Sequence, residues 1–465
     1  MTEEPNLTEP TGVPPSVMSE PPPPARPARF IGGWIAGLVM LGLSIFAAIG
    51  GYVGQFSKPA ESFALQESLK YQVSLRDADV PALKSAMEDG LRSVAKDALA
   101  EAPASDEAAR VAIVAAHELG DKPPPVAIER LRRSRDEYAR QMAEIYGGAV
   151  VTQELVDSFS NAKSDEFAVR LAKVHAKEMI GLPSGREAVV DKGFIGKAAV
   201  TFVVGLLVVL AGIVCLILFL GKLGGPLLRP VGFGAFDRAD GDRYMVRFSL
   251  YMVAFIVLSL VVDGAKKQGI FGRLEGLWVS AIGLFLVLAV TVAMLQLSVV
   301  GRSDSLGEVV SKKRPFGKLV GIGLYGYLCT VPILVLVLVG VNALSRFLPE
   351  PSHPISSEFA SASGLDWLAI ALMAVVLAPI LEEIAFRGLL LPALASQLSR
   401  PIYAVLACGF LFAAIHPQGP LIWPALMTTG AVAAYLRYYS GSLVPSIVLH
   451  VVHNGAIFFM AYLLA

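Results

Sequence analysis

The stretch PILEEIAFRGLLLP, Pro379–Pro392, places three ionisable side chains in a strongly apolar part of the chain. Apolar runs flank it on both sides, so we expect it to lie in a membrane helix, where ionisable groups mark function by default. Glu383 and Arg387 stand four residues apart with the acid first, the spacing that favours an ion pair along a helix. Glu382 has no such partner. A carboxylate without a local cation in apolar surroundings is suited to act as a general base for water.

The composition excludes an ordinary soluble enzyme. Of 465 residues 54% are hydrophobic, and the 39 Lys and Arg residues balance the 39 Asp and Glu residues. These values are typical of a membrane protein with several spans, and they give no basic character that would attract nucleic acid. The three cysteines, Cys215, Cys329 and Cys408, all lie in apolar runs, so we expect neither a disulfide framework nor a zinc site built from cysteines.

Shifts in composition divide the chain into five parts. We expect a disordered cytoplasmic tail (1–28), a signal-anchor transmembrane helix (29–56), a soluble helical domain (57–192), a set of transmembrane helices (193–345) and a C-terminal membrane core (346–465). Candidate helices of the soluble domain are Pro81–Glu101, Asp106–Leu119, Pro125–Tyr146 and Asp165–Ile180. His117 and His175 lie on two of them, and we expect structural or surface positions for both.

Nine apolar segments are expected to span the membrane, which makes the fold an all-α polytopic helical membrane protein with an inserted soluble domain. They are Ile31–Tyr52, Phe194–Leu220, Phe248–Val262, Leu277–Val299, Leu319–Leu344, Leu365–Leu394, Ile402–Ile415, Leu421–Leu436 and Leu443–Leu464. Basic residues in the loops after the second and fourth spans predict that those loops are cytoplasmic and that domain 57–192 is extracytoplasmic. The basic loop 264–275 would then lie outside, against the same rule.

Further polar residues occur on the helices that follow the two glutamates. Phe412 and His416 are four residues apart in FLFAAIHPQ, so they share one helix face. The last apolar run contains LHVVHN, in which His450, His453 and Asn454 lie within one turn of each other. The alternative, a charged helix end that snorkels to the headgroups, does not account for this second set of polar groups.

In this order and on successive membrane helices, these motifs resemble the CAAX-protease and bacteriocin-processing family of intramembrane proteases, the CPBP or Abi family. The similarity covers about Trp367–Ala465, which makes 346–465 the expected protease core. It implies that Glu382 activates water, that His416 assists it, and that His450 and Asn454 stabilise the oxyanion. Glu383, Arg387 and Phe412 would support these residues, with Arg387 and Glu383 holding the helix in register.

The sequence contains no motif of several other protease classes. His-Glu-x-x-His is absent, Gly-x-Ser-x-Gly is absent, and no apolar segment carries two central aspartates. A zinc ion bound by His416, His450 and Glu382 is chemically reasonable, since histidine and carboxylate suit an open three-ligand site. A mechanism without metal uses the same residues, and we expect no tightly bound cofactor.

We therefore predict an intramembrane endopeptidase of a bacterial cytoplasmic membrane that cleaves a membrane-embedded or lipidated peptide or protein. Two other functions stay open. One is a non-catalytic membrane scaffold or bacteriocin-immunity protein whose 57–192 domain binds a protein partner. The other is a proton-coupled transporter, because Glu and His in broken helices also form proton relays. We see no symmetry between halves of the sequence that would favour the transporter.

Overall fold

The computed structural model is helical throughout the part of the chain that it describes. The described residues are 31–55, 62–77, 84–161, 164, 166–190, 193–221, 238–268, 270, 276–296, 314–345 and 364–464, and no strand occurs among them. The predicted all-α class is confirmed. The tail predicted for residues 1–28 lies outside the described residues.

Within the described residues, seven helices are long and apolar enough to cross a membrane, so the chain is a multi-pass integral membrane protein. They are α1 (Ile31–Gln55), α9 (Phe194–Gly221), α10 (Arg238–Lys267), α11 (Gly276–Gln296), α13 (Phe316–Ser345), the compound helix Asp366–Gln397 and α20 (Val444–Leu464). The other two expected spans form the shorter helices α18 (Pro401–Ala414) and α19 (Trp423–Ser440). Pro417 and Pro420 separate these two helices, since proline removes the backbone donor that a continuous helix would need, and Pro424 lies in the first turn of α19.

The compound helix Asp366–Gln397 carries both glutamates, and we call it the glutamate helix. Three α-helical parts, α15 (Asp366–Ala371), α16 (Ala378–Glu383) and α17 (Leu391–Gln397), alternate with two π-helical stretches, Leu372–Leu377 and Ile384–Leu390. Short π-helical stretches inside α-helices occur frequently at functional sites.

The glutamate helix is enclosed by its neighbours, which positions the site in the interior of the bundle. It packs against α10 and α20, α18 pairs with α19, and α20 also packs against α13. Edge-to-face aromatic contacts connect three of these helices, because the ring of Phe386 lies 6.1 Å from that of Phe248 and 5.3 Å from that of Phe412. Such pairs stabilise a core beyond the area that they bury.

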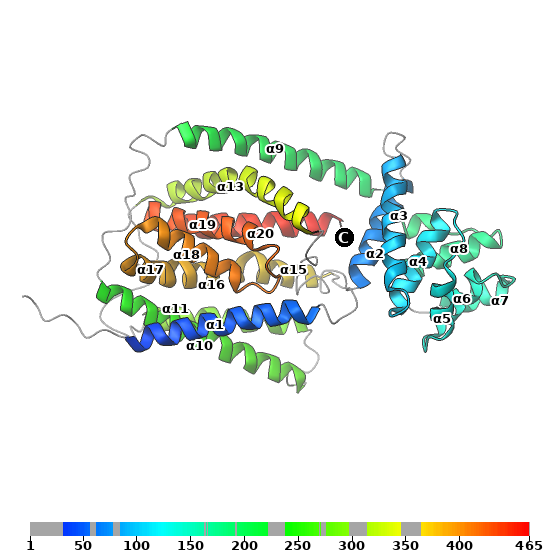
Figure 1. Cartoon of the computed structure of the whole chain (residues 1–465), viewed down its shortest axis with the longest axis horizontal. Helices are drawn as coiled ribbons and strands as arrows, with labels where there is room; N and C mark the ends of the chain where they lie inside the picture. The colour runs from blue at the N-terminus through cyan, green and yellow to red at the C-terminus, as the bar shows by residue number, and fades with distance from the viewer. Residues whose placement is uncertain are drawn as a thin grey trace, which may run out of the picture.

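The helical domain lies at one end of the long axis, beyond the ends of the apolar helices (Figure 1). It comprises α2 (Ser62–Asp77), α3 (Lys84–Glu101), α4 (Asp106–Glu118), α5 (Pro125–Arg132), α6 (Glu137–Tyr146), α7 (Gln153–Asn161) and α8 (Phe167–Met179). The expected start of α4 is confirmed, because the Ser105 hydroxyl caps it by accepting a hydrogen bond from the amide of Ala108.

The sequence prediction for this domain was wrong in two respects. It missed α2 and α7, and it joined α5 and α6 into one helix, Pro125–Tyr146. The break between them has a local cause. The hydroxyl of Ser134 accepts a hydrogen bond from the amide of Asp136 and donates one to Asp106 at 2.5 Å. Serine side chains that bond the nearby backbone in this way compete with helix formation.

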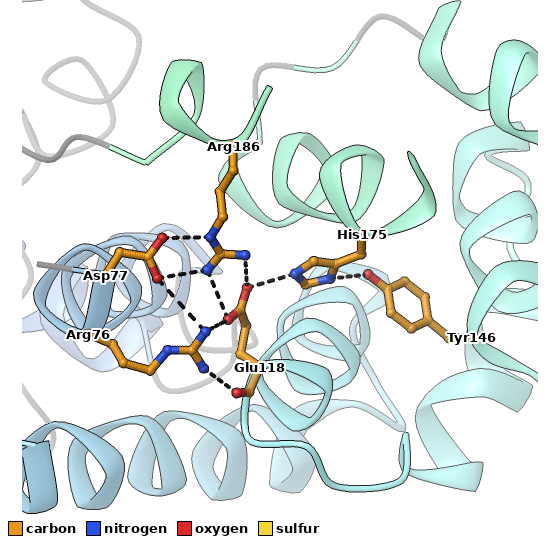
Figure 2. Close-up of polar contacts among 6 residues, drawn as sticks. All are labelled: Arg76, Asp77, Glu118, Tyr146, His175 and Arg186. Carbon is orange, nitrogen blue, oxygen red and sulfur yellow. Dashed lines mark hydrogen bonds and ion pairs between the residues drawn. The ribbon is translucent and has the colours of Figure 1, made fainter. Parts of the chain in front are cut away.

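A polar cluster connects α2, α4, α6 and α8 at the place where these four helices meet (Figure 2). The carboxylate of Glu118 accepts hydrogen bonds from His175 at 2.7 Å and from Arg186 at 2.9 and 3.0 Å, and it also accepts one from Arg76. Asp77 in turn accepts two bonds from Arg186, at 2.6 and 2.9 Å. The cluster therefore ties α2, which follows the first membrane helix, to Arg186, which shortly precedes the second.

Hydrogen bonds of His175 connect α8 to α4 and α6. Because a carboxylate only accepts, Nε2 of His175 donates to Glu118, and Nδ1 of His175 lies 2.7 Å from the hydroxyl of Tyr146. Burial alone would raise the pKa of Glu118, but the bonds from His175 and Arg186 outweigh it and lower that pKa to about 2. His175 is 1% exposed, so the structural position expected for it is the one observed.

Candidate active site

Glu383 lies at the centre of a buried ion-pair network. Its Oε1 atom accepts a hydrogen bond from Arg387 at 2.8 Å, which is the ion pair expected from their spacing. The same oxygen accepts a second bond from His450 Nδ1 at 2.9 Å, across from α20. Glu383 and Arg387 are both 0% exposed. Arg387 is always charged, so Glu383 serves as its buried counter-ion.

Glu382 has different surroundings from its neighbour. Its side chain is 29% exposed, and two imidazole nitrogens face its Oε2 atom, His450 Nε2 at 3.7 Å and His416 Nε2 at 4.0 Å. These separations exceed a direct hydrogen bond, and polar groups at such a distance are commonly bridged by water. The glutamate helix, α20 and the turn after α18 thus bring together Glu382, His450 and His416, which are distant in sequence.

Phe412 fixes the orientation of the groups around it. The guanidinium of Arg387 lies over its ring, 4.4 Å from the centroid, and the ring of His416 lies 4.5 Å away. His416 Nδ1 donates a hydrogen bond to the backbone oxygen of Phe412 at 2.5 Å. Because a carbonyl oxygen only accepts, this bond leaves Nε2 of His416 directed to Glu382. The supporting role expected for Phe412 stays a prediction.

Two glycines allow the helices to approach closely enough for these contacts. A Cβ on Gly409 of α18 would lie 2.7 Å from the backbone nitrogen of Ala431 on α19. A Cβ on Gly430 would lie 3.2 Å from the guanidinium of Arg387, whose second amino group donates to the Gly430 oxygen at 2.9 Å. Glycine at both positions therefore lets α19 supply a backbone acceptor to Arg387.

Asn454 binds the backbone of the glutamate helix. Its side-chain amide donates to the carbonyl oxygen of Ala374 at 2.8 Å. This oxygen lies within the first π-helical stretch. The amide of Ala378 bonds to Met373 there, so the donor that would follow it for Ala374 is residue 379. Residue 379 is a proline and has no N–H. Asn454 thus satisfies the carbonyl that Pro379 leaves without a helical partner, and its second N–H stays available.

The same arrangement recurs at the second π-helical stretch, where it involves a residue that the sequence prediction missed. The amide of Leu391 bonds to the oxygen of Phe386, and the next position is Pro392. The oxygen of Arg387 would pair with that position, and instead it accepts a bond from the Nε of Arg437 on α19 at 3.4 Å. The two prolines in the quoted stretch were the available signal, since each predicts an unpaired carbonyl one turn earlier.

His453 points to a different neighbour from His450. Its ring lies 6.2 Å from the ring of Tyr327 on α13.

The site does not match a zinc centre in this geometry. Two ligands of one tetrahedral zinc lie roughly 3.3 Å apart. The nitrogens of His416 and His450 are farther than that from Glu382 Oε2, at 4.0 and 3.7 Å. Among the residues that the structure describes, no group of three or more His, Cys, Asp or Glu side chains is spaced to hold a metal ion.

Comparisons with known proteins agree with the motifs. Residues 364–456 match the family model of the type II CAAX prenyl endopeptidase Rce1-like proteins, and this range contains all seven expected site residues. The chain is 32% identical over 124 residues to an uncharacterized 24.3 kDa protein of Escherichia coli, and 31% identical over 129 residues to the uncharacterized protein YyaK of Bacillus subtilis (strain 168).

These similarities cover a limited part of each protein. Each alignment takes in 26% of this chain, and it spans 57% of the E. coli protein and 42% of YyaK. No solved structure matches the chain. Residues 364–456 therefore form an Rce1-like domain of the type II CAAX prenyl endopeptidase family, a family of membrane endopeptidases, within a multi-pass integral membrane protein.

Proposed function

We propose that the chain is an intramembrane endopeptidase in which Glu382 is the general base for water. The observation that supports this most directly is that the Nε2 atoms of His416, just after α18, and of His450, on α20, face one carboxylate oxygen of Glu382. The gaps of 4.0 and 3.7 Å leave room for a water molecule. Peptide hydrolysis needs a base next to water, and this oxygen provides one.

The adjacent acid takes a different role. Oε1 of Glu383 is already bonded to Arg387 and His450, and the side chain is buried. It holds His450 with Nδ1 as a donor, which directs Nε2 into the reaction space. We therefore propose the two roles that the sequence predicts: Glu382 activates water, and Glu383 supports the residues around it.

Hydrolysis would proceed in two proton transfers. Glu382 takes a proton from water while the water oxygen attacks the scissile carbonyl carbon. The carbonyl oxygen becomes an oxyanion, which His450 and the side-chain amide of Asn454 stabilise. Glu382 then gives its proton to the amide nitrogen as the C–N bond breaks. His416 orients the water through Nε2 because its Nδ1 is held by Phe412.

We propose a membrane-embedded or lipidated peptide or protein as the substrate and no cofactor. The position of Glu382 within a membrane-spanning helix supports this substrate class. A bacterial cytoplasmic membrane is the proposed location, in agreement with the bacterial origin of the two similar proteins. The partner of the 57–192 domain would be a protein.

The test is proteolysis of a panel of membrane peptides by the purified full-length chain in detergent. Wild type is expected to cleave, and Glu382→Gln, which keeps the shape but removes the base, is expected to lose at least about 100-fold in rate. His453→Ala is the matched control, because this histidine lies on the same helix but faces Tyr327. It should cleave like wild type. Cleavage by Glu382→Gln at the wild-type rate would contradict the proposal.

A second experiment, with a chelator, distinguishes a mechanism without metal from a zinc mechanism. Activity that persists after treatment with a strong zinc chelator supports the mechanism without metal. Activity that is lost on chelation and returns with added zinc would replace it with a zinc mechanism on the same three side chains.

A further inference from the structure

A groove of about 700 Å³ opens between four membrane helices, on the side of α18 and α19 away from the glutamate helix. Its lining is almost entirely apolar and includes Leu216, Phe219, Ile322, Val405, Val432 and Leu436, contributed by α9, α13, α18 and α19. Ligand pockets in proteins have volumes of about 300–1,000 Å³, so the groove is large enough to hold a ligand.

The groove lies beside the packing of α9 on α13, which is the main contact of α9 with the bundle. A Cβ on Gly212 would lie 2.5 Å from the backbone oxygen of Leu328, which marks the closest approach of α9 to α13. The hydroxyl of Tyr325 donates to the oxygen of Cys215 at 2.8 Å. Figure 1 shows α9 as the outermost helix along one side of the bundle. These contacts hold α9 in place and leave a gap beneath it.

The free space around one glycine shows that the groove beneath α9 is open. Gly321 lines the groove, and a Cβ added to it would meet no atom within 4 Å. Glycine is therefore not needed there for close helix packing, in contrast to Gly326 on the same helix, whose Cβ would lie 2.6 Å from Leu436.

One end of the groove is basic and aromatic. Lys318, Tyr435 and Tyr439 line it, and the guanidinium of Arg314 lies over the ring of Tyr439, 5.2 Å from its centroid. Within the described part of the chain, no carboxylate pairs with Lys318. Tyrosines gather at the level of the lipid headgroups, and basic pockets between membrane helices bind anionic lipid headgroups.

We propose that this groove is a specific binding site for an anionic phospholipid, with one acyl chain beneath α9 and the headgroup at Arg314 and Lys318. The apolar lining matches the chain, and the two basic side chains match the negative phosphate. A transmembrane helix of a second copy does not fit, because a helix of ~10 Å diameter and ~30 Å length occupies roughly 2,000 Å³. This site is independent of the peptidase chemistry proposed above.

The experiment uses the full-length chain in detergent with equal amounts of dioleoyl phosphatidylglycerol and dioleoyl phosphatidylcholine. Native mass spectrometry counts the lipids that stay bound. Wild type is expected to retain more phosphatidylglycerol, by about five-fold for each basic side chain that contacts the headgroup. Lys318→Gln should lower that preference about five-fold while the protein still binds lipid.

A second experiment fills the groove with a larger side chain. Gly321→Leu should abolish specific retention of phosphatidylglycerol, since the added side chain occupies the open space. Gly340→Leu is the matched control, because Gly340 lies on the same helix, is equally open and does not line the groove. It should bind lipid like wild type. Both variants replace a helical glycine, so any general effect on helix stability is shared.

Three results would overturn the proposal. Equal retention of the two lipids by wild type would remove the charge selectivity. Unchanged phosphatidylglycerol binding in Gly321→Leu would place the lipid elsewhere. Displacement of phosphatidylglycerol by an equimolar prenylated peptide would assign the groove to the chain of a substrate.

Discussion

The imidazole of His450 donates from Nδ1 to Oε1 of Glu383 at 2.9 Å, although 67 residues separate the two in the sequence. The same oxygen accepts from Arg387, so one carboxylate holds a cation on its own helix and a histidine on α20. Glu382, one residue earlier, is left to face the nitrogens of His416 and His450 at longer distances. Adjacent acids are thereby placed in two different environments.

The first prediction separates the two acids by substitution. Glu383→Ala should lower the apparent free energy of unfolding by about 3–5 kcal/mol, because it leaves the buried Arg387 without its counter-ion. Glu382→Ala should change stability little, since its side chain is partly exposed. It should nevertheless abolish cleavage. Thermal unfolding in detergent and peptide cleavage, measured on the same preparations, give both quantities.

The control for this pair is Glu383→Gln with Arg387→Met, which removes both charges from the buried site. Replacing a buried ion pair by neutral groups is often tolerated, so the double variant should be more stable than Glu383→Ala. A double variant that is no more stable than Glu383→Ala would show that the bond to His450, rather than the ion pair, dominates.

The second prediction concerns Asn454 and Pro379. Asn454→Leu should destabilise the protein by about 1–3 kcal/mol, because the oxygen of Ala374 loses the bond from the side chain of Asn454. Pro379→Ala restores a backbone N–H at the position that π-helical pairing with Ala374 requires. The loss from Asn454→Leu should therefore be much smaller in the Pro379→Ala background, and a double-mutant cycle of unfolding measures the difference.

A third prediction applies the same reasoning to Arg437. Arg437→Leu should be rescued in part by Pro392→Ala, which restores a backbone donor for the oxygen of Arg387. The two pairs serve as controls for each other. Pro392→Ala should not rescue Asn454→Leu, and Pro379→Ala should not rescue Arg437→Leu. Equal rescue in the crossed combinations would indicate a general effect of removing proline.

The fourth prediction concerns the helical domain in acid. The pKa of Glu118 is lowered from 4.5 to about 2 in the folded state, so its contribution is fully present above pH 4.5 and is lost as the pH falls through about 2. The shift corresponds to about 3 kcal/mol. Digestion of residues 62–190 of the full-length chain by pepsin should therefore be slow at pH 4.5 and fast at pH 2.

Two variants check the source of this acid sensitivity. Glu118→Gln should speed digestion at pH 4.5 and flatten the dependence on pH. Glu129→Gln should do neither, because Glu129 forms an exposed pair with Arg133 that contributes little. His117 adds to the same trend, since burial lowers its pKa and the folded state favours its neutral form. A flat wild-type digestion profile between pH 4.5 and 2 would refute the assignment to Glu118.

The sequence predicted the parts of this structure that depend on neighbours along the chain. Apolar runs predicted the membrane helices, and the i,i+4 spacing predicted the pairing of Glu383 with Arg387. The proximity of Glu382 to His416 and His450 followed only from the order of motifs shared with a family. Spacing along one helix does not determine which faces of three helices meet.

The parts that were missed depend on contacts across helices. Arg437 and the acceptor of Asn454 could not be identified, because each bond joins a side chain to a backbone oxygen on another helix. The break between α5 and α6 was missed because the bonds of Ser134 compensate for it at a position with no proline or glycine. Apolar periodicity contains no information about either kind of bond.

The two proline-linked carbonyls also have a consequence for how the protein is made. A backbone oxygen without a donor is unfavourable by several kcal/mol in the hydrocarbon of a bilayer. The glutamate helix emerges from the ribosome before α19 and α20. The oxygens of Ala374 and Arg387 therefore have no side-chain donor until Asn454 and Arg437, respectively, have been synthesised. Full insertion of the glutamate helix therefore depends on the synthesis of α19 and α20. A truncated chain that lacks these two helices would be recognised by membrane quality control.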